Sequence, residues 1–242
     1  MSCRGRRETE ADETARIYAA QGARLVLAGR NASRLDDVRN DLLARGAASA
    51  DVLSYDFADS ERHTEIAQRA NEALGTIDLV LIAHGTLPDQ DAVQDDFALV
   101  QEVLQLNAMS VISLSIAFAE YLIRQESGTL AVISSVAGDR GRQSNYVYGT
   151  AKAAVSTFLS GLRGRLRPHG VQVLTIKPGM VDTPMTAHMS KGALFSTPQK
   201  IAADIERGVR KGSDVIYSPF FWRWIMLIIA MIPERLFKRL RF

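Results

Sequence analysis

Residues 128–152 read GTLAVISSVAGDRGRQSNYVYGTAK. The run from Leu130 to Ile133 is apolar and two serines end it, which is typical of a buried parallel strand that stops at a functional edge. From Tyr148 onward apolar residues recur at helical spacing, so a long helix is expected after the polar loop. The stretch therefore predicts a strand, a loop and a helix whose junction carries chemistry.

Tyr148 and Lys152 stand four residues apart, so on a helix they share one face. An ammonium beside a phenol favours the phenolate, and we expect Lys152 to lower the pKa of Tyr148 from its usual value of about 10. Such a tyrosine exchanges protons with an alcohol or ketone near neutral pH, and Ser135, at the strand's end, can bond the same oxygen. Taken alone, the spacing also fits an ordinary helical pair that faces water.

Strands and helices alternate along the chain. The sequence predicts strands at 24–28, 51–55, 77–82, 129–134, 171–176 and 214–217, with helices at 12–21, 33–45, 91–124, 146–167 and 198–210 and a further helix that ends near residue 74. This alternation predicts an α/β fold, a Rossmann-like doubly wound parallel sheet, in a single domain at 1–217 followed by an apolar and basic helical tail at 218–242. In such sheets ligands bind at the carboxyl ends of the strands.

The placing of Ser135 thirteen residues before Tyr148, with Lys152 four after it, resembles the short-chain dehydrogenase/reductase family, as does the order of elements from about residue 12 to 217. The resemblance implies that Tyr148 is the general acid in reduction and that Ser135 orients the carbonyl. Lys152 would lower the pKa of the tyrosine and hold the cofactor's ribose. Asn107 would anchor a water that feeds Lys152, although an asparagine within a helix is also typical of a local bend or cap.

The resemblance also implies a nicotinamide cofactor. Arg30 follows the second strand of the family pattern, where NADP-users carry an arginine, and its planar fork can pair with a 2′-phosphate, so NADP(H) is favoured over NAD(H). The alternative is a solvated arginine at a strand end. Asp56 stands where relatives hold the adenine amine, and an acidic residue there is otherwise a common helix cap.

Two loops complete the expected cofactor site, together with Tyr148 and Lys152. The family's Asn-Asn-Ala-Gly is replaced by Ile-Ala-His-Gly at 82–85, in which Ala83 and Gly85 keep the backbone close to the cofactor and His84 is interpreted as structural. Residues 178–183 resemble the loop over the nicotinamide. The cofactor-binding positions there are Pro178, Gly179, Val181 and Thr183, with Thr183 on the carboxamide.

The beginning of the sequence departs from the family. The family starts with an apolar strand and a Thr-Gly-x-x-x-Gly-x-Gly turn, whose backbone N–H groups hold the pyrophosphate. Residues 1–11 instead carry charges at 4, 6, 7, 8 and 10, and Gly5 is the only glycine before Gly22. Our hypothesis is that the first strand and the glycine-rich loop have been lost. The alternative is a divergent relative that binds no nucleotide.

Two further segments bear on the substrate. Arg140 and Arg142 lie in the loop after Ser135, either as solvated charges or as a clamp for a phosphorylated substrate. The tail at 219–242 has an uncharged run at 224–232 that is too short to span a bilayer, with two tryptophans at or near its start and basic residues after it. It fits a helix that lies in a membrane interface, or a packing or oligomer segment.

Four stretches resemble one branch of the family: Ser-Ser-Val-Ala-Gly-Asp-Arg-Gly-Arg at 134–142, Tyr-Gly-Thr-Ala-Lys at 148–152, Thr-Ala-His-Met at 186–189 and Ile-Pro-x-x-x-Phe-Lys at 232–238. That branch is the decaprenylphosphoryl-2-keto-ribose reductases, which reduce a 2-keto pentose on a polyprenyl phosphate and work with a flavoprotein oxidase. That resemblance implies a lipid-linked ketoreductase with peripheral membrane contact through 219–242. The alternatives are an enzyme for a small soluble ketone or alcohol, and a truncated, non-catalytic relative. A homo-oligomer is also expected from the family.

Composition restricts the remaining classes. A chain of 242 residues with 47% apolar content can bury the core of one domain, and a net charge of +2 gives no bulk attraction to nucleic acid. Cys3 is the single cysteine, which favours a reducing, cytoplasmic compartment, with the inner face of the membrane as the site of any contact through the tail. No pair of His or Cys residues has metal-ligand spacing, so no metal site is expected.

Overall fold

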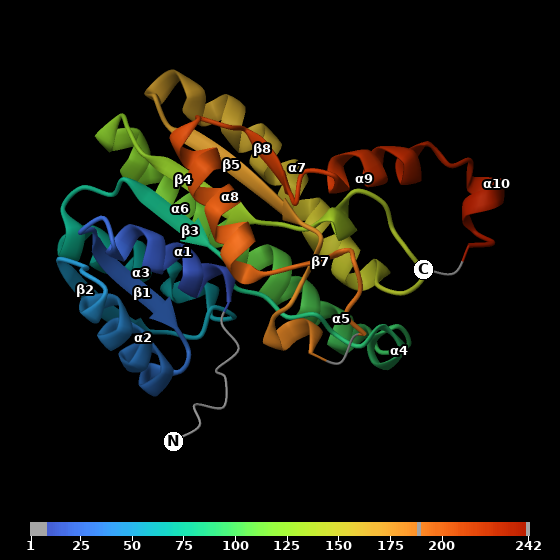
Figure 1. The fold of residues 1–242 in the computed structure, drawn as a ribbon, viewed down its shortest axis with the longest axis horizontal. Coiled ribbons are helices and arrows are strands. Elements are labelled where there is room, and N and C mark those ends of the chain that lie inside the picture. The colour runs from blue at the N-terminus through green and yellow to red at the C-terminus, as the bar shows by residue number, and fades with distance from the viewer. Residues whose placement is uncertain (1–8, 188–189, 241–242) are drawn as a thin grey trace.

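The computed structural model describes residues 9–187 and 190–240. Its helices and strands alternate in chain order (Figure 1). They are α1 (Glu10–Ala19), β1 (Arg24–Gly29), α2 (Ala32–Ala44), β2 (Ser49–Ser54), η1 (Ser60–Arg62), α3 (His63–Leu74), β3 (Leu79–Ile82), α4 (Gln90–Val93), α5 (Phe97–Leu104), η2 (Gln105–Met109), α6 (Ser110–Gln125), β4 (Thr129–Ile133), η3 (Val136–Gly138), α7 (Tyr146–Leu166), η4 (Arg167–His169), β5 (Gln172–Pro178), β6 (Met180–Val181), η5 (Pro184–Thr186), β7 (Phe195–Ser196), α8 (Pro198–Arg210), β8 (Val215–Ser218), α9 (Trp222–Met231) and α10 (Glu234–Phe237).

The central sheet is parallel and covered by helices on both faces, as predicted. Its four strands lie in the order β3-β4-β5-β8. Successive strand residues point to opposite faces, so Val173 packs in the core with α3, α6 and α7, while Leu174 packs against Ile201 and Ile205 of α8. The carboxyl ends of β4 and β5 therefore meet at one edge between the two helical layers, and the doubly wound α/β prediction is confirmed.

Strands β1 and β2 pair in parallel in a separate sheet. Within the described residues no strand lies between β1 and β3, so the facing edges of these two strands have no ladder partner. None of the six residues of β1 is fully buried, whereas four of the five in β4 are. The sheet is thus divided at the position where the family pattern places its first strand. Residues 1–8, on which the hypothesis of a lost first strand partly rests, lie outside the described residues.

The helical region predicted over 91–124 is divided into several helices in the structure, α4, α5, η2 and α6. Asp96 starts a new helix there, because its carboxylate accepts from the N–H groups of Ala98 and Leu99 and so caps α5. Between α5 and α6 the chain makes a π-helical segment, η2, which is a feature often found at functional sites.

In the part of the chain that the structure describes, one helical stretch, Phe97–Gln125, is long and apolar enough to cross a membrane. Half of its most apolar window is buried, and Val111, Leu114 and Phe118 belong to the main core, so this stretch packs as a core helix. The shorter apolar helix α9 and the following α10 form the tail, drawn in red at the right of Figure 1.

Candidate active site

Ser134 and Ser135 end β4, and each makes a different contact. The Ser134 hydroxyl donates to the Lys152 carbonyl at 3.0 Å and lies 2.7 Å from the Ser156 hydroxyl, which joins the strand end to α7. The Ser135 hydroxyl accepts from the Ala137 N–H at 3.1 Å and caps η3. Ser135 also faces the Tyr148 phenol and lowers its pKa, so the strand end and the helix meet at the predicted pair.

Two glycines allow α7 to come this close. A Cβ at Gly149 would lie 2.8 Å from the Ala137 carbonyl oxygen, and one at Gly138 would lie 2.7 Å from the Lys152 backbone. Only glycine fits at such separations without a shift of the backbone. The Tyr-Gly-Thr-Ala-Lys order thus has a steric reason, because the glycine after Tyr148 lets the helix pack directly on the loop that carries Ser135.

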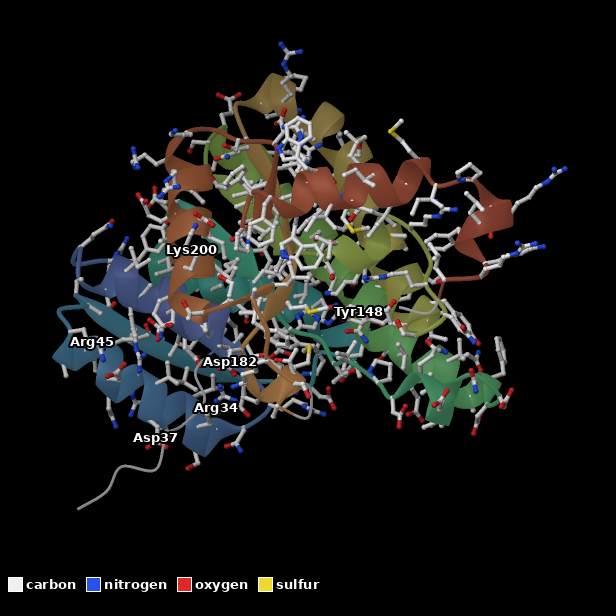
Figure 2. The ribbon with its side chains drawn as sticks, turned by 45° about the vertical axis from the view of Figure 1, so that its right-hand side comes forward. Arg34, Asp37, Arg45, Tyr148, Asp182 and Lys200 are labelled. Carbon is white, nitrogen blue, oxygen red and sulfur yellow. The ribbon has the colours of Figure 1, made fainter. Side chains whose placement is uncertain are left out.

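Lys152 is 3% exposed, and its Nζ donates to the Ile133 carbonyl at 3.1 Å. The same Nζ lies 5.7 Å from the centre of the Tyr148 ring. Figure 2 shows Tyr148 well inside the molecule, far from Arg34, Asp37 and Arg45 on α2. Ser135, Tyr148 and Lys152 are therefore brought together at the carboxyl end of β4.

The expected depression of the tyrosine pKa was wrong. Burial raises the pKa of Tyr148 to about 12; the hydrogen bond with Ser135 lowers it, and the Glu10 carboxylate raises it. Burial also lowers the pKa of Lys152 to about 8, against the effect of Glu10. Desolvation outweighs charge attraction here, because the ammonium is directed at the Ile133 carbonyl rather than at the phenol oxygen.

Glu10 is a residue that sequence reasoning missed. Burial raises the pKa of Glu10 above its usual range, with Asp12 acting in the same direction, while a backbone hydrogen bond and the charge of Lys152 lower it. The first residue of α1 is thus electrostatically coupled to Tyr148 and Lys152. The acidic run around residues 8–13 was the available signal, but the sequence gives no sign that a helix start faces Lys152.

The residues at this helix start do not suit a diphosphate. Thr9 and Asp12 form a reciprocal capping box, so the N–H groups of these two residues already have partners, and Glu10, Asp12 and Glu13 place carboxylates in the first turn. Helix N-termini bind phosphate through free N–H groups and positive dipole ends. The reactive end of a nicotinamide nucleotide fits the groups around Tyr148 and Lys152, but its phosphate end meets carboxylates at α1.

Asn107 lies in the π-helical segment η2 and is fully buried. Its Oδ1 accepts from the Thr86 N–H at 2.8 Å, and its Nδ2 donates to the Val103 carbonyl at 3.0 Å. A Cβ at Gly85 would lie 2.6 Å from Asn107 Oδ1 and 3.7 Å from Lys152 Nζ. The structure therefore places Gly85, Asn107 and Lys152 beside one another, and their contacts with a cofactor or a water stay predictions.

His84 stacks on Phe57 with ring centroids 4.5 Å apart, and its Nε2 lies 2.7 Å from the Ser110 hydroxyl. That hydroxyl donates to the Leu106 carbonyl, so His84 Nε2–H is the donor to Ser110. Burial lowers the pKa of His84 to about 3, with the charges of Lys152 and His63 acting in the same direction. A neutral, bonded and stacked imidazole has the packing of a structural residue.

Arg30 and Asp56, the residues predicted to contact the adenosine part of the cofactor, lie just after strands. Arg30 follows β1, and its exposed guanidinium makes no hydrogen bond or ion pair within residues 9–187 and 190–240. Asp56 follows β2 and is exposed, and its carboxylate accepts from the Ala58 N–H at 3.0 Å, which is a local turn cap. Both residues are accessible at the carboxyl edge.

The loop after β5 lies beside the tail. Pro178 ends the strand, and the Gly179 N–H donates to the Ser218 carbonyl at 3.1 Å. A Cβ at Gly179 would lie 1.9 Å from Trp222 Nε1, so the indole of α9 packs directly on this glycine. Val181 and Thr183 are both buried; the Thr183 N–H donates to Val181 at 3.0 Å.

Arg140 is not a free anion clamp, and this expectation is corrected. Its guanidinium donates to the Ile229 carbonyl at 2.5 Å and the Ile232 carbonyl at 2.7 Å, and it pairs with Glu234 at 3.0 Å. It also lies 3.6 Å from the centre of the Phe237 ring. Arg140 therefore fastens the tail to the loop after Ser135, because the end of α9 offers carbonyls without helical partners.

Arg142 remains a candidate for substrate binding. Its Nε is buried without a hydrogen-bond partner in the described chain; burial lowers its pKa, and Asp139 raises it. The Asp139 carboxylate accepts from Lys177 Nζ at 2.5 Å and from the Tyr217 hydroxyl at 2.9 Å, which joins this loop to β5 and β8. Within the described residues no group of three or more His, Cys, Asp or Glu side chains could hold a metal ion.

Comparison with known proteins agrees with this geometry. A family model for short chain dehydrogenases matches residues 10–193. An uncharacterized oxidoreductase of Mycobacterium tuberculosis is 34% identical over 236 residues, which are 98% of this chain and 94% of that protein. One from Streptomyces coelicolor is 36% identical over 228 residues, 94% of this chain and 90% of the relative.

Solved structures share the fold at low identity. A short-chain dehydrogenase from Sphingobium yanoikuyae in complex with NADPH has a TM-score of 0.79 at 21% identity, over 93% of both chains. A 7α-hydroxysteroid dehydrogenase complexed with NADH and 7-oxo glycochenodeoxycholic acid has a TM-score of 0.78 at 20% identity, over 87% of this chain and 88% of that one. The family match and the two relatives show the family, and the solved structures share its fold. The chain belongs to the short-chain dehydrogenase/reductase family of oxidoreductases.

Proposed function

We propose that this protein is a carbonyl reductase that uses NADP(H), with Ser135, Tyr148 and Lys152 as its catalytic residues. The observation that supports the proposal is their meeting at the carboxyl end of β4, where Ser135 lowers the pKa of the phenol and Lys152 lies beside its ring. The Tyr148 phenol is protonated at neutral pH and can act as the proton donor in reduction, while the burial that raises its pKa to about 12 makes it a weaker acid.

In this mechanism the substrate carbonyl oxygen accepts hydrogen bonds from Ser135 and Tyr148. The phenol O–H transfers its proton to that oxygen as the alcohol forms. Lys152, fixed by the Ile133 carbonyl, holds the cofactor's ribose, and Asn107 keeps the chain near Gly85 in place beside it. The nicotinamide, when bound, supplies the hydride. Ala83, Gly85, Pro178, Gly179, Val181 and Thr183 would surround it.

We further propose a preference for NADP(H), supported by the exposed guanidinium of Arg30 at the end of β1. A planar guanidinium pairs well with a 2′-phosphate. Asp56, at the end of β2, would contact the adenine. NAD(H) would lack the phosphate partner and bind less tightly.

The substrate we propose is a keto-sugar carried on a polyprenyl phosphate, with Arg142 near the phosphate. Its support is the likeness of the sequence to the decaprenylphosphoryl-2-keto-ribose reductases, together with an apolar tail packed beside the site. A flavoprotein oxidase that makes the keto-sugar, and a homo-oligomeric assembly, belong to the same proposal. Catalysis would take place in the cytoplasm at the inner face of the membrane. A small soluble ketone or alcohol is the second candidate substrate.

Calorimetric titration of the 242-residue chain with NADPH and NADH tests the cofactor proposal. Micromolar NADPH binding that is weaker for NADH, and that Arg30→Gln reduces to the NADH level, is the expected result. Arg167→Gln, an exposed arginine of η4 before the start of β5, is the matched control. A folded chain that binds neither nucleotide would contradict the proposal and favour a relative whose acidic α1 start excludes the diphosphate.

A further inference from the structure

Helix α9 is apolar on two opposite faces. On one face Trp222 and Met226 are buried against Val136 and Met180, beside the catalytic loops. The opposite face has no cover in the described structure. Its exposed fractions are 74% at Phe220, 57% at Trp224, 49% at Leu227, 66% at Ile228 and 73% at Met231.

An uncovered apolar face of this kind marks an interaction surface. A surface helix of a globular protein is normally polar on the side away from the core. Here the outward side instead carries bulky aliphatic and aromatic residues, and Leu236 and Leu240 add exposed apolar groups beyond the helix. Something apolar must meet this face in the working protein.

The charges of the tail indicate which kind of partner covers this face. Residues 219–240 contain four basic side chains, all exposed, at Arg223, Arg235, Lys238 and Arg239. The only carboxylate in that segment, Glu234, is paired with Arg140. We infer that α9 and α10 dock this face on an anionic lipid bilayer, with the apolar side chains at the acyl boundary and the basic ones among the headgroups.

A second copy of the chain suits this face less well. In a two-fold interface the same patch meets itself, so the basic side chains of one tail would face those of the other. Within residues 219–240 the one carboxylate, that of Glu234, is already bound to Arg140 and does not balance them. Anionic headgroups supply the missing counter-charge.

The docking surface is fixed to the catalytic region. Arg140 bonds the carbonyls at the end of α9 and stacks on Phe237 of α10, and Trp222 packs on Gly179. Figure 2 shows the red tail on the same half of the molecule as Tyr148. A bilayer under the tail would hold the site next to the lipid surface. This inference deepens the proposed function, which needs access to a lipid-linked substrate, but docking can be measured without turnover.

The test uses the full-length chain and vesicles of phosphatidylcholine with or without phosphatidylglycerol. Both tryptophans of the chain lie in the tail, so tryptophan fluorescence, excited selectively over the tyrosines, reports on the tail alone. We expect flotation with the anionic vesicles only, accompanied by a blue shift that Trp224→Phe abolishes and Trp222→Phe retains. The exposed Trp224 is the reporter and the buried Trp222 its control.

Two variant pairs identify the contacts. Ile228→Gln with Met231→Gln should lower the floated fraction at least tenfold, while Leu43→Gln, an exposed apolar site on α2, should leave it unchanged. Lys238→Gln with Arg239→Gln should lower it as well, and Lys211→Gln on the body should not. Circular dichroism confirms that each variant is folded.

Equal flotation of the wild type and the Ile228→Gln/Met231→Gln variant would overturn the inference. The inference would also be overturned if the wild type bound no vesicles but formed a dimer, and if the Ile228→Gln/Met231→Gln variant were a monomer. The face would then be covered by a second copy of the chain. Docking without NADPH-dependent reduction of any carbonyl would contradict the proposed function and leave the docking inference intact. NADPH-dependent reduction of a soluble ketone by a chain that does not float with vesicles would contradict the docking inference and leave the proposed reductase activity intact.

Discussion

At the residue scale, the assignment of Tyr148 as proton donor has a close control on the same helix. Tyr148→Phe keeps the ring and removes the O–H, so carbonyl reduction should fall on the order of 10²–10⁴-fold. Tyr146→Phe changes an exposed phenol two residues earlier and should have no effect. Steady-state NADPH oxidation with a ketone measures both. Equal losses in the two variants would show that the phenol of Tyr148 is not the acid.

The shifted pKa of Lys152 should make the free energy of unfolding depend on pH. Its folded pKa of about 8 lies below the usual lysine value of 10.5, so between these values the unfolded chain binds more protons and the free energy of unfolding rises with pH. Relative to Lys152→Met, the wild type should gain on the order of 1–3 kcal/mol from pH 8 to 10. Urea unfolding across this range measures the difference. Parallel curves for the two proteins would mean that the ammonium is not desolvated.

At the element scale, the close packing of α7 on the loop after Ser135 depends on Gly149. A Cβ there would meet the Ala137 carbonyl at 2.8 Å, so Gly149→Ala should destabilise the protein by about 1–3 kcal/mol and separate Tyr148 from Ser135. Gly161, on the same helix, has nothing within 4 Å of its Cβ position. Gly161→Ala should therefore be neutral or stabilising by up to ~1 kcal/mol. Thermal unfolding and activity of both variants check this.

How much of these elements could be predicted depended on the range of the interactions that make them. The strand at Thr129–Ile133 and the helix after it follow from local periodicity, and the ends of the helix at Pro198–Arg210 were predicted to the residue. The π-helical segment at Gln105–Met109 was not predictable, because it carries the same apolar pattern as the α-helices around it. A bond to the backbone of Thr86, twenty-one residues away, accompanies it.

The candidate site was predictable where the family motif is local, as at Ser135, Tyr148 and Lys152. The roles of Glu10 and Arg140 were not, because each depends on segments far apart in sequence. Arg140 pairs with Glu234 across 94 residues, and no spacing rule connects them. The direction of the Tyr148 pKa was also missed, since burial of the whole site, not the neighbouring charge, decides it.

At the scale of the whole molecule, the division of the sheet should produce two regions of unequal stability. The strands β3, β4, β5 and β8 enclose the large core with α3, α6 and α7. Strands β1 and β2 contribute to that core through Val26, Ala28 and Leu53, but their other face packs only on the small cluster that α1 and α2 bury around Ala19, Leu42 and Ala47. Strand β1 pairs on one side only within the described residues. Local opening costs least where few apolar contacts hold the backbone.

We therefore expect the hydrogen-bonded amides of β1 and β2 to exchange with solvent at least about tenfold faster than those of β4 and β5. Native-state hydrogen exchange followed by mass spectrometry measures this. The comparison uses only bonded amides, so the open edges themselves do not bias it. Equal protection in the two sheets would mean that they unfold as one unit, joined through the packing of α1 on α8, and that the gap between β1 and β3 does not weaken the fold.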